Sequence, residues 1–299
     1  SKETALFMAS LFDLSPFSKE ISILDPGAGS GILTAALVQR IIDIDKIEEI
    51  KITCYETNDD ILELLNKNLS WIKDNSPLKI EYKVLKDNYI TSQTLEYNDM
   101  LGACIEPEKY DLIIGNPPYL KIGRMAEEAL AMQDICYGAP NLYFLFMEMA
   151  SFNLVDNGEL VFIIPRSWTS GAYFRKFREK FLREVALKHI HLFISRDKVF
   201  DKETVLQETI IVKAKKGFDN SNNITITTTN TNFDFDSKTV FKVPYDMVVS
   251  GKHKYVFLVT DQEEADTIEK VNEWKDTLPT LGLKMKTGLT VDFRNREAL

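Results

Sequence analysis

The chain has 299 residues, of which 44% are hydrophobic and 27% are charged, and its formal net charge is −9 at pH 7. These values are typical of a soluble globular protein and exclude the collagenous and disordered classes. No apolar run approaches the roughly 20 residues that a membrane helix needs. No signal peptide is visible either, so we expect no membrane partner and a cytoplasmic location. The three cysteines, Cys54, Cys104 and Cys136, lack metal-ligand spacing, which argues against a metal site and a disulfide scaffold.

Charge is distributed unevenly along the chain. Acidic side chains outnumber basic ones in residues 1–165, whereas basic side chains are in excess in residues 166–216. The overall acidity argues against a nucleic-acid partner, but a basic block on an acidic chain is a candidate phosphate-facing surface. The alternative is a solvated helix face, and charge alone favours that alternative.

Apolar runs and helical periodicity alternate from the N-terminus onward. Strands are predicted at 21–24, 51–55, 80–85, 110–115, 160–165, 190–194 and 209–213, and helices at 32–44, 59–71, 142–154 and 170–184. This alternation, with near-continuous apolar strands, predicts a doubly wound α/β fold around a parallel sheet. After residue 216 the composition shifts toward Asn, Thr and Ser, so we expect 1–216 and 217–299 to be separate regions.

A glycine-rich turn follows the first predicted strand. The sequence ILDPGAGSG reads as a strand end, a turn and a helix start. Gly27 and Gly29 allow the backbone to approach a ligand closely, and the helix N-terminus offers free N–H groups. The spacing differs from the dinucleotide fingerprint, and no Walker lysine follows, so the loop alone is a moderate signal for a nucleotide-like cofactor.

Carboxylates stand at the ends of the next two predicted strands. Glu56 follows the second strand and is placed to accept hydrogen bonds from both ribose hydroxyls. Asp87 follows the third strand and is placed to accept from an adenine amino group. Taken singly, each is better explained as a surface residue. Because ligands bind where the carboxyl ends of parallel strands meet, the three strand ends together predict a cofactor crevice.

The sequence Asn116-Pro117-Pro118-Tyr119 follows the fourth predicted strand and is the sharpest signal in the chain. The two prolines fix the backbone, so the Asn116 side-chain oxygen and the Pro117 carbonyl become two held acceptors. A planar NH2 group can donate one hydrogen to each, which directs the nitrogen lone pair toward an electrophile. Tyr119 offers a flat face for a base or amide to stack on.

The succession of DPGAGSG, an acidic strand end and NPPY resembles the S-adenosylmethionine-dependent amino-methyltransferases. Its order resembles the gamma arrangement of the adenine-N6 DNA methyltransferases of restriction–modification systems, in the TaqI-like class. The segments FIIPRSWTSGAYFRKFREKFL and VFDKETVLQETIIVKAKKG are similar to the same class, so the resemblance covers residues 1–216 well and the rest weakly. It implies an α/β, Rossmann-like methyltransferase fold with a mostly parallel seven-stranded sheet and an antiparallel edge hairpin.

The resemblance also implies roles for individual residues. Contacts to S-adenosylmethionine are implied for Thr4, Asp25, Pro26, Gly27, Gly29, Glu56, Asp87 and Asn88. Catalysis is implied for Asn116, Pro117 and Tyr119, and stacking on the target base for Tyr119 and Phe200. The family often has Asp-Phe where this chain has Asp87-Asn88-Tyr89, so Asn88 is expected to contribute only its backbone.

The implied substrate is double-stranded DNA, with a cognate restriction endonuclease, separate or fused, as a further partner in a bacterial cytoplasm. The target base must then be flipped out of the duplex. Cations on the basic helix are expected to follow DNA phosphates: Arg175, Lys176, Arg178 and Lys180. Alternative functions are methyl transfer to guanine N2 in RNA or to a protein glutamine, and a catalytically silent DNA-binding subunit. A nicotinamide dehydrogenase is disfavoured by the glycine spacing.

The last segment, LGLKMKTGLTVDFRNREAL, resembles the opening of the family's target-recognition domain. It is too short to form a core of its own. We therefore expect the chain to be a truncated enzyme that lacks a more basic C-terminal part.

Overall fold

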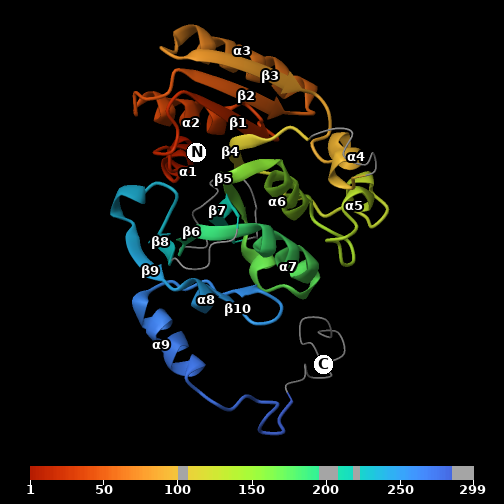
Figure 1. Cartoon of the computed structure of the whole chain (residues 1–299), viewed down its shortest axis with the longest axis vertical. Coiled ribbons are helices and arrows are strands. Elements are labelled where there is room, and N and C mark those ends of the chain that lie inside the picture. The colour runs from red at the N-terminus through yellow and green to blue at the C-terminus, as the bar shows by residue number, and fades with distance from the viewer. Residues whose placement is uncertain (100–106, 195–207, 218–222, 285–299) are drawn as a thin grey trace, which may run out of the picture. The chain divides into compact units, whose positions relative to one another are not determined.

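The computed structural model describes residues 1–99, 107–194, 208–217 and 223–284 (Figure 1). The chain divides into two compact units, Ser1–Thr260 and Asp261–Leu299. The described part of the second unit contains α9 (Gln262–Asn272), which Asp261 caps by accepting from the Glu264 N–H. The sheet and the candidate site belong to the first unit.

In the described residues, the first unit is built on a nine-stranded sheet with the order β3-β2-β1-β4-β5-β7-β6-β8-β9. Its strands are β1 (Glu20–Pro26), β2 (Glu49–Tyr55), β3 (Lys79–Leu85), β4 (Tyr110–Gly115), β5 (Leu154–Pro165), β6 (Val185–Phe193), β7 (Thr209–Lys216), β8 (Ile224–Thr229) and β9 (Thr239–Val243). Strands β1 to β5 are mutually parallel. Strand β7 is antiparallel to both of its neighbours, β5 and β6. A separate antiparallel pair is formed by β10 (Val249–Ser250) and β11 (Tyr255–Val256).

Helices connect the strands and cover the sheet. They are α1 (Lys2–Ser10), α2 (Ile32–Ile42), α3 (Asp59–Asn75), α4 (Thr94–Tyr97), α5 (Glu127–Ala131), α6 (Leu142–Asn153), α7 (Arg175–Glu184) and α8 (Tyr245–Val248). Short 3-10 helices are η1 (Thr91–Gln93), η2 (Arg166–Thr169), η3 (Ala172–Phe174) and η4 (Phe235–Ser237). Helix α6 packs on β5 and α7, and α7 packs on β6. Figure 1 shows α6 and α7 across the sheet from α1 and α2.

Alternation along the strands builds the core. Ile21 and Ile23 of β1 point to one face of the sheet, because side chains of a strand alternate between faces. They join Leu37 of α2 and Leu65 of α3 in one apolar cluster, and all four are fully buried. Burying one such side chain stabilises the fold by about 1.5–3 kcal/mol. This cluster fixes α2 and α3 behind the strands whose ends carry the candidate site.

The sheet differs from the seven-stranded prediction. It has nine strands in the described residues, and the predicted edge hairpin is not confirmed, because the antiparallel β7 lies inside the sheet between β5 and β6. Two strands beyond residue 216, β8 and β9, extend the same sheet. The division into functional regions near residue 217 stays a prediction. In the described residues, no helix is both long and apolar enough to span a bilayer.

Buried polar side chains attach β8 to β6. Thr227 Oγ1 lies 2.8 Å from His189 Nε2 and 2.8 Å from His191 Nδ1. Burial lowers the pKa of His191 to about 3 and that of His189 to about 4, so both rings are neutral at pH 7. These two histidines are therefore structural, as their alternation along one strand indicates.

Candidate functional site

A cavity of about 320 Å³ lies at the carboxyl ends of β1 to β4. Parallel register brings these ends together, since Pro26 pairs with Tyr55, and Tyr55 with Leu85. Strand β1 has β2 on one side and β4 on the other, so the strand order reverses here, where open α/β sheets bind ligands. The lining residues are Gly27, Tyr55, Glu56, Thr57, Asp87, Asn88, Tyr89, Asn116, Pro118, Leu142 and Phe146. The cavity therefore joins all four of the predicted strand-end motifs.

The glycine loop turns sharply after β1. Gly27, Gly29 and Gly31 have φ values of 75°, 55° and 80°, in the left-handed region that favours glycine. The N–H groups of Gly27 and Ala28 both donate to the Tyr55 carbonyl, at 2.9 and 2.8 Å. These bonds hold the loop against the end of β2.

The Glu56 carboxylate connects this loop to the second strand end. Its Oε2 accepts from the Gly29 N–H at 2.9 Å, and its Oε1 accepts from the Asn58 N–H at 2.8 Å. A carboxylate has about four acceptor positions, so each oxygen can still accept from a ligand hydroxyl. Glu56 thus has a fixed orientation and free lone pairs at the wall of the cavity.

Four of the predicted cofactor residues do not line the cavity: Thr4, Asp25, Pro26 and Gly29. Asp25 is fully buried, and its Oδ2 accepts from Thr34 Oγ1 of α2 at 2.7 Å. Burial raises the pKa of Asp25 to about 7, because desolvation disfavours the charged carboxylate. Asp25 therefore braces the loop against α2. Cofactor contacts by all four residues stay predictions.

Asp87 and Asn88 line the cavity in different ways. Asp87 is exposed, with its carboxylate accessible. The Asn88 side chain is already occupied: Oδ1 accepts from the Ile90 and Thr91 N–H groups, and Nδ2 donates to Glu128 Oε1 at 2.8 Å. The protein therefore holds the Asn88 side chain, and a backbone contact of Asn88 with the cofactor stays a prediction.

Aromatic and apolar side chains form a wall of the cavity that the sequence reasoning missed. Tyr89 lies between Tyr55 and Phe146, with ring centroids 5.0 and 5.2 Å away. Its hydroxyl donates to Asn153 Oδ1 at 2.8 Å, which fixes the ring. Leu142 and Phe146 come from successive turns of α6. Their i, i+4 spacing in an apolar helix was the available signal, but the same spacing is typical of ordinary core residues.

The Asn-Pro-Pro-Tyr element follows β4 and borders the same cavity. Asn116 is exposed and Pro117 is buried, so the turn is anchored on one side and open on the other. The Tyr119 hydroxyl lies 3.0 Å from Asn116 Oδ1 and 3.0 Å from the Ile163 carbonyl oxygen. It has one hydrogen to donate, so it is shared between the two acceptors. The hydroxyl thereby orients the Asn116 amide, a contact that the sequence did not predict. Phe200 lies outside the described residues.

Two of the four cations predicted to follow DNA phosphates are engaged inside the protein. Arg178 is fully buried, and its Nη1 donates to the carbonyls of Trp168 and Gly171 at 2.9 and 2.7 Å. Lys180 Nζ donates to the Tyr97 hydroxyl at 2.6 Å and to Asp134 Oδ2 at 2.9 Å. Protein acceptors thus already hold both cations, and contacts of Arg178 and Lys180 with DNA phosphates stay predictions. Arg175 and Lys176 are exposed.

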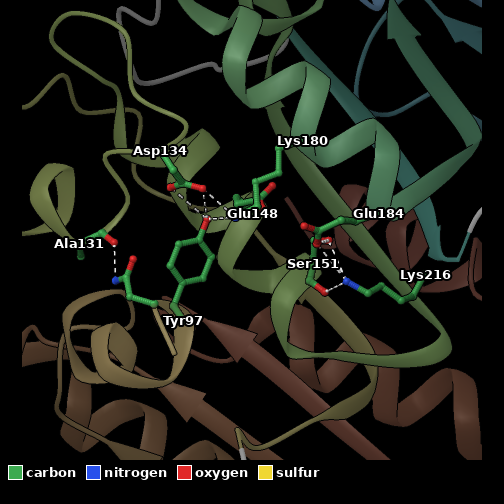
Figure 2. A network of polar contacts seen from close by, with 9 residues as sticks. Tyr97, Ala131, Asp134, Glu148, Ser151, Lys180, Glu184 and Lys216 are labelled. Atoms are coloured by element: carbon green, nitrogen blue, oxygen red, sulfur yellow. Dashed lines mark hydrogen bonds and ion pairs between the residues drawn. The ribbon is translucent and has the colours of Figure 1, made fainter. Parts of the chain in front are cut away.

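Figure 2 shows the network that Lys180 joins. Glu148 of α6 is fully buried, and Lys180 Nζ lies 3.2 Å from its Oε1, at ion-pair distance but without hydrogen-bond geometry. Glu184 of α7 lies in the same network and accepts from Ser151 and Lys216, both at 3.1 Å. Burial, and then the negative charge of Glu184, raises the pKa of Glu148 to about 8. The network ties α4, α6 and α7 together behind the aromatic wall.

This pKa predicts a pH dependence of stability. An ordinary Glu has a pKa near 4.5, so between pH 4.5 and 8 the folded state binds more protons at Glu148 than the unfolded state does. The stabilisation from this group is full below pH 4.5 and is lost as the pH rises through 8. Between pH 6 and pH 9, we expect the melting temperature of Glu148→Gln to fall by less than the melting temperature of the wild type. Scanning calorimetry measures both. Glu63→Gln replaces an exposed carboxylate and is the control. If the melting temperatures of Glu148→Gln and the wild type change with pH in parallel, the raised pKa of Glu148 is contradicted.

Comparison with known proteins shows which family the chain belongs to. Residues 30–200 match the family model described as Eco57I restriction-modification methylase. The chain belongs to this family. Two type II methyltransferases of curated function align with nearly all of it: M.PstI of Providencia stuartii, 35% identical over 309 residues, and M.BsuBI of Bacillus subtilis, 32% identical over 301 residues. The chain spans 58% of the length of each of these two relatives.

A solved structure has the same fold. The modification subunit of a putative type I restriction enzyme from Vibrio vulnificus YJ016 superposes with a TM-score of 0.62 over 92% of this chain and 61% of that one. The two sequences are 14% identical, so the likeness concerns the fold. It agrees with a methyltransferase-type arrangement of a mostly parallel sheet between helices.

Proposed function

We propose that this chain is the catalytic part of a DNA methyltransferase that transfers a methyl group from S-adenosylmethionine to the N6 atom of adenine in a specific sequence. The observation that carries the proposal is the single cavity bordered by both Glu56 and Asn116. It places a candidate cofactor carboxylate and a candidate amine acceptor at one strand edge. Membership of a restriction-modification methylase family and similarity to two type II methyltransferases support DNA as the substrate. A restriction endonuclease is the implied partner.

The lining residues fit S-adenosylmethionine. The adenine has an aromatic and apolar wall in Tyr89, Leu142 and Phe146, and Asp87 is the exposed acceptor for its amino group. The ribose hydroxyls have the fixed Glu56 carboxylate. The cofactor supplies an electrophilic methyl group on a sulfonium. In this account, the chain supplies the surfaces that hold the cofactor and aim it at the neighbouring Asn116.

In this account the protein promotes the reaction by positioning the target amino group. The target amino group donates one hydrogen to Asn116 Oδ1 and one to the Pro117 carbonyl, which turns its lone pair toward the methyl group. With the cofactor held at Glu56 and Asp87, the nitrogen would take the methyl group in line as the bond from that carbon to the sulfonium sulfur breaks and the neutral thioether leaves. The nitrogen would then lose a proton to solvent, so no base is needed before attack. Pre-set acceptors of this kind lower the barrier because they require no reorganisation during the reaction.

Two variants of Tyr119 separate the contribution of its hydroxyl from the contribution of its ring. Tyr119→Phe removes the hydroxyl that orients Asn116 and keeps the ring, so we expect a fall in the transfer rate with little change in the Michaelis constant for DNA. Tyr119→Ala also removes the stacking surface, worth ~1–3 kcal/mol per base, so it should additionally raise that Michaelis constant. Steady-state kinetics on both variants checks this. Equal parameters for the two variants would show that the ring does not stack on the base.

The substrate class is tested by labelled methyl transfer. We expect label from S-adenosylmethionine in duplex DNA, and none in RNA or in a release factor offered at the same concentration. Label in RNA or in the release factor, without label in DNA, would favour the guanine-N2 or glutamine alternatives. Cofactor binding without transfer to any substrate would favour the catalytically silent subunit.

A further inference from the structure

A closed ring of hydrogen bonds lies behind the aromatic wall of the cavity at the ends of β1 to β4. The Tyr89 hydroxyl donates to Asn153 Oδ1 at 2.8 Å, and Asn153 Nδ2 donates to Gln93 Oε1 at 2.7 Å. Gln93 Nε2 donates to the backbone carbonyl of Tyr89 at 2.7 Å, which closes the ring. The ring therefore holds Tyr89 at two points, by its side chain and by its backbone.

Asn153 is the residue on which this hydrogen-bonded ring depends. It is fully buried at the end of α6, and its Nδ2 also donates to the Glu108 carbonyl at 3.1 Å. Both hydrogens of the amide nitrogen thus have an oxygen acceptor, so the amide oxygen is the atom that faces the Tyr89 hydroxyl. A buried network of neutral partners resists rearrangement, because each broken bond would leave a buried polar group unpaired.

Tyr89 is the member of the hydrogen-bonded ring that gives its aromatic side chain to the cavity wall. It packs between Tyr55 and Phe146, and Phe146 in turn covers the glycine loop, since a Cβ atom at Gly27 would lie 3.6 Å from Phe146 Cε1. Phe146 and Asn153 lie on the same face of α6, because their spacing is close to a whole number of helical turns. One helix face therefore supplies both a wall of the cavity and the amide that holds the neighbouring wall residue.

We propose that Asn153 is a positioning residue for the cofactor: together with Gln93, it holds the Tyr89 side chain where the adenosine part of the cofactor packs. This inference rests on the proposed function, in which S-adenosylmethionine occupies this cavity. Ordering a side chain on binding costs free energy, so a wall residue that is ordered beforehand gives tighter binding. Asn153 itself is not among the residues that line the cavity, so its effect passes through Tyr89.

Asn153→Leu keeps the size of the side chain and removes both polar atoms, which leaves the Tyr89 hydroxyl unpaired. From the ordering of one side chain, we expect calorimetry to give a roughly three- to tenfold lower affinity for S-adenosylmethionine. The affinity for methylthioadenosine, which has the adenosine part without the amino acid, should fall by the same factor. In steady-state kinetics the Michaelis constant for the cofactor should rise, while the rate at saturating cofactor stays at the wild-type value because Asn116 is unchanged.

Gln93→Leu tests the same hydrogen-bonded ring at a partly buried position, where a folding defect is a smaller risk. It should lower both affinities by a smaller factor, because Asn153 keeps the Glu108 carbonyl and the Tyr89 hydroxyl as partners. Tyr89→Phe combined with Asn153→Leu should lose no more affinity than Asn153→Leu alone, since both changes break the same bond. Additive losses in the double variant would contradict an effect that passes through Tyr89.

The control is Ser151→Ala, at another buried residue of α6, whose hydroxyl donates to Glu184 Oε2 at 3.1 Å. It should lower the melting temperature and leave the affinity for the cofactor unchanged. Wild-type affinity in Asn153→Leu, or equal losses of affinity in Asn153→Leu and Ser151→Ala, would overturn the proposal. Failure of the proposed function is distinct, because the wild type would then transfer no methyl group to DNA, while the affinities for the cofactor are measured without DNA.

Discussion

Asn116→Ala is expected to reduce methyl transfer to DNA by a factor of roughly 100 to 1000, the loss typical of removing one pre-set hydrogen-bond partner of a reacting group. The side-chain oxygen is one of the two acceptors that turn the amine lone pair toward the methyl group. Alanine leaves the turn in place, because the prolines and not the Asn side chain fix its backbone. Calorimetry should therefore give an affinity for S-adenosylmethionine close to that of the wild type.

Asn66→Ala is the matched control for this variant. Asn66 is an exposed residue of α3 and donates to the Leu62 carbonyl of its own helix. Its replacement should leave transfer unchanged. An Asn116→Ala protein that binds cofactor normally and still transfers at the wild-type rate would refute the role of this side chain.

Glu56→Ala is expected to weaken S-adenosylmethionine binding by ~1–3 kcal/mol, the cost of leaving polar groups unpaired in a closed site. The structure adds a second cause, because Glu56 also accepts from the Gly29 N–H and holds the glycine loop. Glu56→Gln keeps one acceptor oxygen, so its loss should be smaller. Isothermal calorimetry with the cofactor measures both.

The control for the carboxylate is Glu81→Ala. Glu81 is an exposed residue of β3 whose partner is Lys79, and it does not line the cavity. Its affinity for the cofactor should equal that of the wild type. If Glu56→Ala also binds with wild-type affinity, Glu56 is not part of the cofactor site.

The strand-end motifs could be read from the sequence because each is local. DPGAGSG, Glu56, Asp87 and Asn116 each follow directly on a predicted apolar strand, and the parallel arrangement alone brings such ends to one edge. The aromatic wall could not be read in this way. Tyr89 and Phe146 are far apart in the chain and meet only after α6 has packed on the sheet.

The basic helix shows where local pattern fails. Phe177 and Phe181, four residues apart in this helix, are fully buried, as such apolar spacing predicts. Arg178 was expected to follow DNA phosphates, but it is fully buried, and the carbonyl of His253, 75 residues further on, accepts from its Nε. Lys180 likewise forms ion pairs with Asp134 and Glu148, which are distant from it in the sequence. Likewise, the threonine-rich β8 pairs with β6 through two histidines that the sequence places more than thirty residues earlier.

The most direct test of the central claim is nucleoside analysis of DNA after reaction with S-adenosylmethionine. Duplex DNA is incubated with the wild-type chain or with Asn116→Ala, digested to nucleosides and examined by mass spectrometry. The account predicts N6-methyladenine with the wild type and almost none with the variant. Methylation on cytosine or guanine, or equal N6-methyladenine from both proteins, would contradict it.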